Sequence, residues 1–455
     1  MSSMAPAATA VVLSAMLTPV AASLHAQGSA VHPPVSAPQA DSAGMARAAY
    51  GRSVAAYRKK DIATARLEMV RAVDAWPTQQ AYLEYSAGLA AVARDTAAVA
   101  RWLDRLADLG IGNGVAHDSS FRALAGAPAY DAAVERLASA TAPVVRSRVR
   151  LTVADSMFHP EGVAFDARTG RWFVGSVRQR RVMVVERDGT TRDFVRPAAD
   201  GIAGVFGMAV DDARRTLWMA TTSLPRMQDF SASDSGRVGV YGYDLDTGRL
   251  RRRAWAPRDS SVAHTFGDVV VAPNGDVYAS DSQAPWIYRL PVGGDSLVRF
   301  ATHPLLRSPQ GMAISPDGET MYVADYSHGL MRLDLRSKAV TPLRVPAGVT
   351  LLGVDGLYLH RGALIGVQNG VAPARIARFC LDADGRGVRR LEIVDRNTAV
   401  ADEPTLGVVV GDSLFYVATS QWDKFDDAGG RVATAALRPA TVLGVALESR
   451  SACRR

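Results

Sequence analysis

Six short segments of the chain share one pattern, and they limit the fold more than any other feature. Each holds two runs of alternating apolar residues separated by a turn rich in Gly, Asp or Pro, which is typical of two antiparallel strands. The segments are EGVAFDARTGRWFVGS, FGMAVDDARRTLWMAT, GDVVVAPNGDVYASD, QGMAISPDGETMYVAD, DGLYLHRGALIGVQN and PTLGVVVGDSLFYVAT, starting at Glu161, Phe206, Gly267, Gln310, Asp355 and Pro404. Their starts lie 43 to 61 residues apart. A repeat of this length and pattern predicts a β-propeller with one four-stranded blade per segment.

Six segments predict six blades, and therefore an all-β propeller over residues 145–447. Closing the ring leaves only short, protected strand edges, whereas an open array would expose long ones. We expect Val149–Val153 to supply the strand that completes the last blade, beside Thr441–Leu447. Residues 448–455 then form a C-terminal tail.

The region before the propeller has a different pattern. Residues 41–140 are rich in Ala and carry apolar residues at helical spacing, which predicts an α-helical domain. Asp61 and Asp95 each precede such a run and are candidate N-caps, because their carboxylates can accept from the first-turn amides. Their offset of 34 residues is the period of tetratricopeptide repeats, which this region resembles. A peptide-binding groove and a packing appendage both stay open as the role of this domain.

The first 26 residues are typical of a secretory signal peptide. They contain no Asp, Glu, Lys or Arg, and an apolar stretch from Ala10 to Ala22 ends in small residues. Residues 27–40, rich in Pro, Ser and Ala, are predicted to form a linker. The apolar stretch is shorter than the ~20 residues that cross a membrane, so we expect no span in the mature chain and a periplasmic or secreted protein. Export permits, without requiring, a disulfide between Cys380 and Cys453.

Charge and composition exclude several classes of function. The chain has 52 Lys and Arg against 45 Asp and Glu, a modest excess without a long basic run, so we expect no nucleic-acid partner. Two cysteines are too few for a cysteine zinc site or an iron–sulfur cluster. The sequence also contains no phosphate-binding loop, dinucleotide fingerprint, HExxH or GxSxG motif.

The residues that open the six segments are the candidate metal ligands. The first strand of every propeller blade lines the central axis, so these residues should face one another. Glu161 and Asp355 offer carboxylates and Gln310 offers an amide oxygen, and oxygen ligands from separate blades suit a hard cation. We therefore predict a divalent cation, with calcium as the natural ion, bound by Glu161, Gln310 and Asp355. The alternative is that these residues cap turns and bind backbone amides.

Residues beside these positions are candidates for contact with a substrate or for catalysis. Phe206 opens the second segment, Asp268 follows Gly267, and His264 lies within three residues of Gly267, so we predict that these three side chains contact a substrate. His159 lies within three residues of an axial position and is a candidate proton acceptor, although a lone His beside a strand is more often a packing residue. Five further acids are better explained as turn residues that accept hydrogen bonds from backbone amides, namely Asp166, Asp211, Asp281, Asp317 and Asp325.

Three of these phrases carry a family resemblance. HPEGVAFD around Glu161, SPQGMAISPDG around Gln310 and GVDGLYL around Asp355 resemble the senescence marker protein/gluconolactonase family and, more distantly, the strictosidine synthase and paraoxonase propellers. The resemblance covers about residues 150–447 and implies that Glu161 and Asp355 hold a metal. Gln310 stands where the family has an Asn-Gly ligand, and Gly267 stands where the family usually offers Asn, which removes one side-chain oxygen.

The resemblance implies metal-assisted hydrolysis of a small-molecule lactone or ester. The cation would polarise the carbonyl and stabilise the developing oxyanion, while Asp355 or a neighbouring histidine, His159 or His264, takes a proton from water. The alternative is a non-catalytic scaffold, in which the propeller and the helical domain bind a protein or peptide and the axial acids hold a structural calcium ion.

Overall fold

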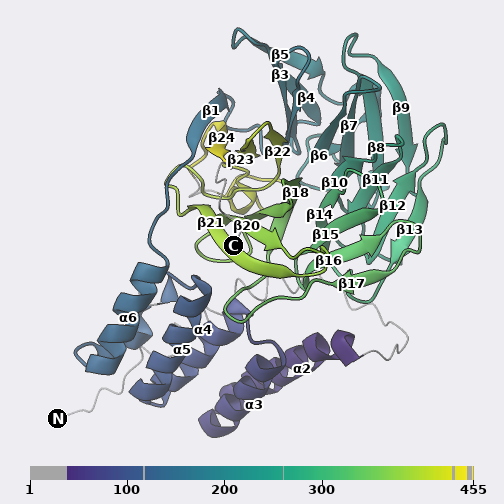
Figure 1. Ribbon diagram of the computed structural model, residues 1–455. Helices are drawn as coiled ribbons and strands as arrows, with labels where there is room; N and C mark the ends of the chain where they lie inside the picture. Colours follow the sequence, from purple (N-terminus) through teal and green to yellow (C-terminus); the bar gives the residue numbers. More distant parts are fainter. Residues whose placement is uncertain (1–37, 116–117, 260, 433–435, 448–452, 454–455) are drawn as a thin grey trace. The chain divides into compact units, whose positions relative to one another are not determined.

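The computed structural model describes residues 38–115, 118–259, 261–432, 436–447 and 453 (Figure 1). The predicted signal peptide, residues 1–26, lies outside the described residues. The chain divides into two compact units, one with the helices up to residue 142 together with 347–350 and 371–373, and the other with the remainder. Among the described helices, none combines the length and the apolar composition that crossing a membrane requires.

Within the described residues 38–115 and 118–142, the helical unit has five α-helices and one short 3-10 helix. They are α2 (Pro38–Arg58), α3 (Ile62–Ala75), α4 (Gln80–Val92), α5 (Thr96–Leu109), η2 (Ser119–Leu124) and α6 (Pro128–Ala140). Helix α2 begins inside the predicted linker 27–40. Asp61 and Asp95 accept hydrogen bonds from the backbone amides of Thr64 and Ala98, each at 3.0 Å, which confirms both predicted N-caps.

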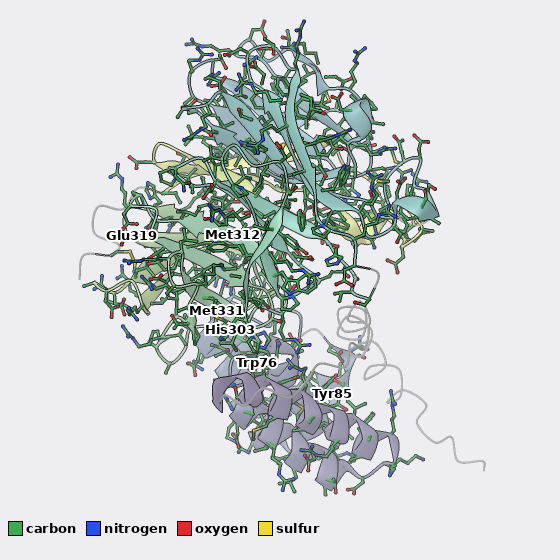
Figure 2. All side chains as sticks on the ribbon, turned by 90° about the vertical axis from the view of Figure 1, so that its right-hand side faces the viewer. Trp76, Tyr85, His303, Met312, Glu319 and Met331 are labelled. Atoms are coloured by element: carbon green, nitrogen blue, oxygen red, sulfur yellow. A yellow bond between two sulfur atoms is a disulfide. The ribbon has the colours of Figure 1, made fainter. Side chains whose placement is uncertain are left out.

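Aromatic and small side chains form the core of the helical unit. Buried alanines let the helices approach closely, and Tyr50 stacks on Tyr82 with ring centroids 5.2 Å apart. Trp76 and Tyr85, both labelled in Figure 2, pack edge-on against this pair. The resemblance to tetratricopeptide repeats stays a prediction.

The other unit is a propeller of six four-stranded antiparallel sheets, as predicted. The first blade is β2 (Pro160–Asp166), β3 (Arg171–Ser176), β4 (Arg181–Val185) and β5 (Thr191–Val195). The second is β6 (Gly204–Asp211), β7 (Thr216–Thr222), β8 (Val238–Asp244) and β9 (Leu250–Trp255). The third is β10 (Phe266–Val271), β11 (Val277–Asp281), β12 (Trp286–Leu290) and β13 (Val298–Thr302).

The remaining blades continue the same order around the ring. The fourth is β14 (Pro309–Ile314), β15 (Thr320–Asp325), β16 (Gly329–Asp334) and β17 (Val340–Pro342). The fifth is β18 (Val354–His360), β19 (Ala363–Gln368), β20 (Arg375–Leu381) and β21 (Val388–Arg396). The sixth is β22 (Gly407–Val410), β23 (Ser413–Val417), β24 (Ala440–Ala446) and β1 (Arg148–Val153).

The sixth blade closes the ring with strands from both ends of the propeller sequence. Strand β1 pairs with β24, with Val149 opposite Leu443 and Thr152 opposite Thr441, as predicted. The innermost strands β2, β6, β10, β14, β18 and β22 each contact the innermost strands of the two neighbouring blades. Closure therefore brings residues from every blade toward one axis.

The inner strands of the first five blades share an irregularity that determines what faces the axis. The register of pairing shifts between Pro160 and Val163 in β2, and at the equivalent place in β6, β10, β14 and β18. Such bulges change the direction in which a side chain points. A Cβ added at Gly162 would lie 2.3 Å from the carbonyl oxygen of Phe206, so glycine there permits the close approach of two inner strands.

The structure also bears on the predicted turn acids and on the two cysteines. Asp281 accepts the backbone amide of Thr265 at 3.0 Å and Asp325 accepts that of Ser308 at 2.7 Å, which confirms both as residues that bind backbone amides at strand ends. Cys380 in β20 is buried and forms a disulfide with Cys453, which ties Cys453 to the fifth blade.

Candidate functional site

Glu161 of β2 and Asp355 of β18 form an acid pair drawn from two different blades. Burial raises the pKa of Glu161 well above its usual range, and the nearby charges of Asp355 and Glu403 raise it further. Burial also raises the pKa of Asp355 to about 6, although a hydrogen bond from Asn369 opposes this shift. Two carboxylates in a desolvated position repel each other, so a cation or a shared proton stabilises the pair.

Both acids are bound by neutral donors. The indole Nε1 of Trp422 donates to Glu161 Oε2 at 2.7 Å. The amide Nδ2 of Asn369 donates to Asp355 Oδ2 at 2.8 Å and to the carbonyl oxygen of Pro404 at 2.9 Å. These donors orient the two carboxylates without supplying a compensating positive charge.

Gln310, the predicted amide ligand, has both ends of its side chain engaged. Its Oε1 accepts from Ser282 Oγ at 2.9 Å, and its Nε2 donates to Ser308 Oγ at 3.2 Å. A Cβ added at Gly267 would lie 2.9 Å from Gln310 Oε1, so the long Gln side chain fills the space beside that glycine. In this arrangement Gln310 links the third and fourth blades, and its role as a metal ligand stays a prediction.

Asp268 lies in the same axial region and is also buried. Its Oδ2 accepts from the backbone amide of Met312 at 3.2 Å; Met312 is labelled in Figure 2 and belongs to β14. Burial raises the pKa of Asp268 to about 7, and the charge of Asp355 adds to this shift. Burial raises the pKa of the Tyr358 phenol as well, and the charges of Asp268, Asp355 and Glu161 add to this shift.

His159 occupies an aromatic stack. The buried ring is parallel to Phe425 at 5.0 Å between centroids and meets Trp422 edge-on at 4.6 Å. Neither ring nitrogen has a hydrogen-bond partner within the described part of the chain. Burial, together with the charges of Arg226 and Arg178, lowers the pKa of His159 to about 3. A neutral, stacked imidazole of this kind suits packing better than proton transfer near pH 7.

The other two predicted substrate contacts differ in their surroundings. Phe206 is buried, and its ring centroid lies 5.8 Å from that of Trp422. His264 Nδ1 lies 2.6 Å from Asp281 Oδ2, so this imidazole is held in a buried His–Asp pair. Its Nε2 is buried and has no partner among the residues the structure describes. Their roles toward a substrate stay predictions.

The structure adds three residues that the sequence interpretation missed, namely Asn369, Glu403 and Trp422. Asn369 closes the fifth segment, DGLYLHRGALIGVQN, at the place where the third and fourth segments end in Asp, and this correspondence is the signal that points to it. Glu403 Oε2 accepts from the backbone amide of Trp422 at 2.6 Å, and burial raises its pKa to about 7. Trp422 lies 261 positions from Glu161, and no local pattern marks it.

The acid pair offers part of a coordination shell for a hard cation. No group of three or more His, Cys, Asp or Glu side chains in the described ranges is arranged to hold a metal. The amide oxygen Asn369 Oδ1 is buried, however, and has no partner among the described residues. If the side-chain amide were flipped, Oδ1 would face two acceptor atoms, Asp355 Oδ2 and the carbonyl oxygen of Pro404. The two hydrogen bonds therefore determine which amide atom is nitrogen and which is oxygen. Carboxylates and amide oxygens are the kinds of ligand that calcium takes, and water completes its shell.

Comparisons with known proteins found similar solved structures at low sequence identity. No protein-family model and no curated protein matches the sequence. Similar solved structures include a gluconolactonase from Xanthomonas campestris (18% identity, 68% of this chain and 93% of that chain, TM-score 0.43) and the calcium-binding protein regucalcin from Agrobacterium tumefaciens (16%, 65% and 93%, 0.44). Another is virginiamycin B lyase from Staphylococcus aureus (14%, 59% and 81%, 0.42). Likenesses at this level carry no argument about activity.

Proposed function

We propose that the protein is an exported, metal-dependent hydrolase of lactones or esters. The observation that carries this proposal is the Glu161–Asp355 pair, in which a buried and a half-buried carboxylate repel each other and are bound by neutral donors. Structural acids are usually compensated by a cationic side chain, whereas an acid pair that retains its repulsion is typical of a ligand site.

Three side chains would hold the cation, namely Glu161, Asp355 and Asn369 through its Oδ1. The bound cation would polarise the substrate carbonyl and stabilise the developing oxyanion. Asp355 Oδ2 accepts from Asn369, and the lone pairs of the carboxylate that bind neither Asn369 nor the cation would accept a proton. A water oxygen bonds to the carbonyl carbon as its proton passes to Asp355. The acyl C–O bond then breaks, and the leaving alkoxide takes that proton, so the products are a carboxylic acid and an alcohol.

The test of this proposal combines metal analysis with a panel of lactones and esters, with and without a chelator. We expect bound calcium, chelator-sensitive turnover, and a loss of at least about 100-fold in kcat for Asp355→Asn, the size typical of removing a general base. Recovery of the Asp355→Asn variant at saturating calcium would indicate a pure ligand role. Asp317→Asn, at an exposed turn, is the matched control. A metal-loaded protein that hydrolyses nothing on the panel contradicts the proposal.

A binding scaffold with a structural calcium ion is the second candidate. It is favoured by the indole of Trp422, which already occupies one oxygen of Glu161. The helical unit also has a hollow of about 510 Å³ whose lining includes the exposed Met45 on α2 and Arg71 on α3, which suits a peptide. A scaffold predicts that calcium raises the Tm by mass action while no substrate is turned over.

A further inference from the structure

One position recurs in three consecutive blades, directly after the second strand. Strands β11, β15 and β19 each end at a residue that pairs with the first residue of the inner strand in the same blade. The residues that follow these strand ends are therefore equivalent, namely Ser282, Tyr326 and Asn369. All three are half-buried, whereas the residue before each of them is fully buried. Solvent, and so a dissolved ligand, reaches this position in each of the three blades.

Two of these three side chains contact residues that face the axis. Ser282 of the third blade donates to Gln310 Oε1, which belongs to the inner strand of the fourth blade. Asn369 of the fifth blade donates to Asp355 Oδ2 in its own inner strand. Tyr326 occupies the same position in the fourth blade, and β15, which it follows, contacts both β14 and β18. The repeat therefore places the Tyr326 side chain between the strands that carry Gln310 and Asp355.

Two glycines of the fifth blade hold Tyr326 at this position. Its carbonyl oxygen accepts from the backbone N–H of Gly353 at 2.8 Å. A Cβ added at Gly370 would lie 2.7 Å from Tyr326 Cζ and 2.8 Å from its hydroxyl oxygen, so the hydroxyl end of the ring packs against Gly370. Glycine permits this close approach. Because Gly370 directly follows Asn369, the phenol lies beside the residue that binds Asp355.

The phenol at this position is a donor that the fold does not use. In the part of the chain that the structure describes, the Tyr326 hydroxyl has no hydrogen-bond partner. A structural tyrosine usually has one, as Tyr322 of the same blade does when it donates to the carbonyl oxygen of Gly385 at 3.1 Å. Burial raises the pKa of Tyr326, and the charges of Asp355 and Glu403 raise it further, so the phenol keeps its proton at neutral pH.

We propose that Tyr326 is a catalytic residue, which donates a hydrogen bond to the carbonyl oxygen of the lactone or ester and to the oxyanion that forms from it. This inference deepens the proposed hydrolysis at Asp355 and rests on it. The phenol keeps its proton and forms no covalent bond, while the water oxygen bonds to the carbonyl carbon and Asp355 accepts the proton of water. A donor aimed at developing negative charge stabilises the transition state more than the ground state.

Tyr326→Phe tests this role, because it keeps the ring against Gly370 and removes only the hydroxyl. We expect kcat to fall about 100-fold on the best substrate of the panel, the size typical of one lost oxyanion donor. KM should change by less than about threefold, since the contact strengthens only in the transition state. Tyr322→Phe removes the same atom from the same blade and is the matched control, with kcat unchanged. Circular dichroism checks that both variants are folded.

A second measurement does not depend on turnover. A methyl phosphonate monoester carries negatively charged oxygens on a tetrahedral centre, so it imitates the oxyanion. Calorimetry in the presence of calcium should show about tenfold weaker binding of this phosphonate to Tyr326→Phe, the size expected of one lost hydrogen bond to a charged group. Tyr322→Phe should bind it as the unmodified protein does. The calcium affinity of both variants should be unchanged, because the phenol is placed toward the substrate.

The outcomes separate this inference from the proposed function. An active unmodified protein whose kcat is matched by Tyr326→Phe overturns the role of the phenol and leaves the proposed hydrolysis intact. Equal losses of kcat in Tyr326→Phe and Tyr322→Phe would indicate a structural effect and also overturn the inference. An unmodified protein that hydrolyses nothing on the panel removes the proposed function and the inference together.

Discussion

Two acids at opposite ends of strand β2 have opposite electrostatic surroundings. Asp166 is fully buried, and Arg215 donates to its two oxygens at 2.8 and 2.7 Å. Burial alone would raise the pKa of Asp166, but hydrogen bonds from Arg215, Thr169 and Arg171 hold it well below its usual range. Glu161 is similarly buried, but the donor to its carboxylate is the neutral indole of Trp422, and its pKa is raised. The comparison teaches that the available partners, rather than burial, distinguish a structural acid from a ligand-binding acid.

The largest expected difference between the two acids is in stability. Asp166→Ala leaves Arg215 and Arg171 without their buried partner, so we expect a loss of about 3 kcal/mol in the free energy of unfolding, as for other broken buried ion pairs. Glu161→Gln removes a repulsion in the metal-free protein and should leave stability unchanged or raised. Urea unfolding of both variants in the presence of a chelator measures this. Equal losses for the two substitutions would contradict the comparison.

The pH dependence of stability should also separate the two groups of acids. Asp355, Asp268 and Glu403 have raised pKa values of about 6, 7 and 7, so the folded state binds their protons more tightly than the unfolded state does. Their contribution therefore lowers the stability of the metal-free protein as pH rises from about 4 to about 7. The lowered pKa of Asp166 acts in the opposite direction, because its stabilisation is present above pH 4 and is lost as pH falls below that value.

Unfolding experiments between pH 3 and pH 8 check this expectation. The difference in stability between Glu161→Gln and the unmodified protein should grow as pH rises, because the variant has lost one of the coupled acids. Calcium should reverse the trend, since the ion binds the deprotonated carboxylates. A difference that does not depend on pH would show that the pKa of Glu161 is the same in the folded and unfolded states, and would contradict its raised value.

The smallest expected effect is at an exposed turn. Asp317 accepts from the backbone amide of Glu319 at 2.9 Å in the turn between β14 and β15, and Figure 2 labels Glu319. We expect Asp317→Asn to change the free energy of unfolding by less than about 0.5 kcal/mol, as for most surface substitutions. Thermal unfolding and calcium calorimetry should both match the unmodified protein. A clear loss of calcium affinity would place this turn in the cation site.

Local patterns predicted several parts of the molecule because the interactions they depend on are local. Alternating apolar residues bury one face of a strand, and a carboxylate before a helical run caps its first turn, so the six blades and both N-caps follow from nearby residues. The loop after β7 is different, because Arg226 acts on Trp422, 196 positions away. A contact between residues so far apart in the sequence cannot be predicted from local patterns, because the residues next to Arg226 and to Trp422 do not indicate the pairing.

The sequence by itself determined the six-bladed ring, the helices before it, and the presence of Glu161 and Asp355 at the starts of inner strands. Only the tertiary structure decided what those acids contact. Closure of the ring and the bulges in the inner strands bring Asn369 and Trp422 to them, while Gln310 turns to Ser282 and Ser308. The physical reason is that a strand's periodicity selects the face on which a side chain lies, whereas its partners come from other blades, which are placed by packing across the axis.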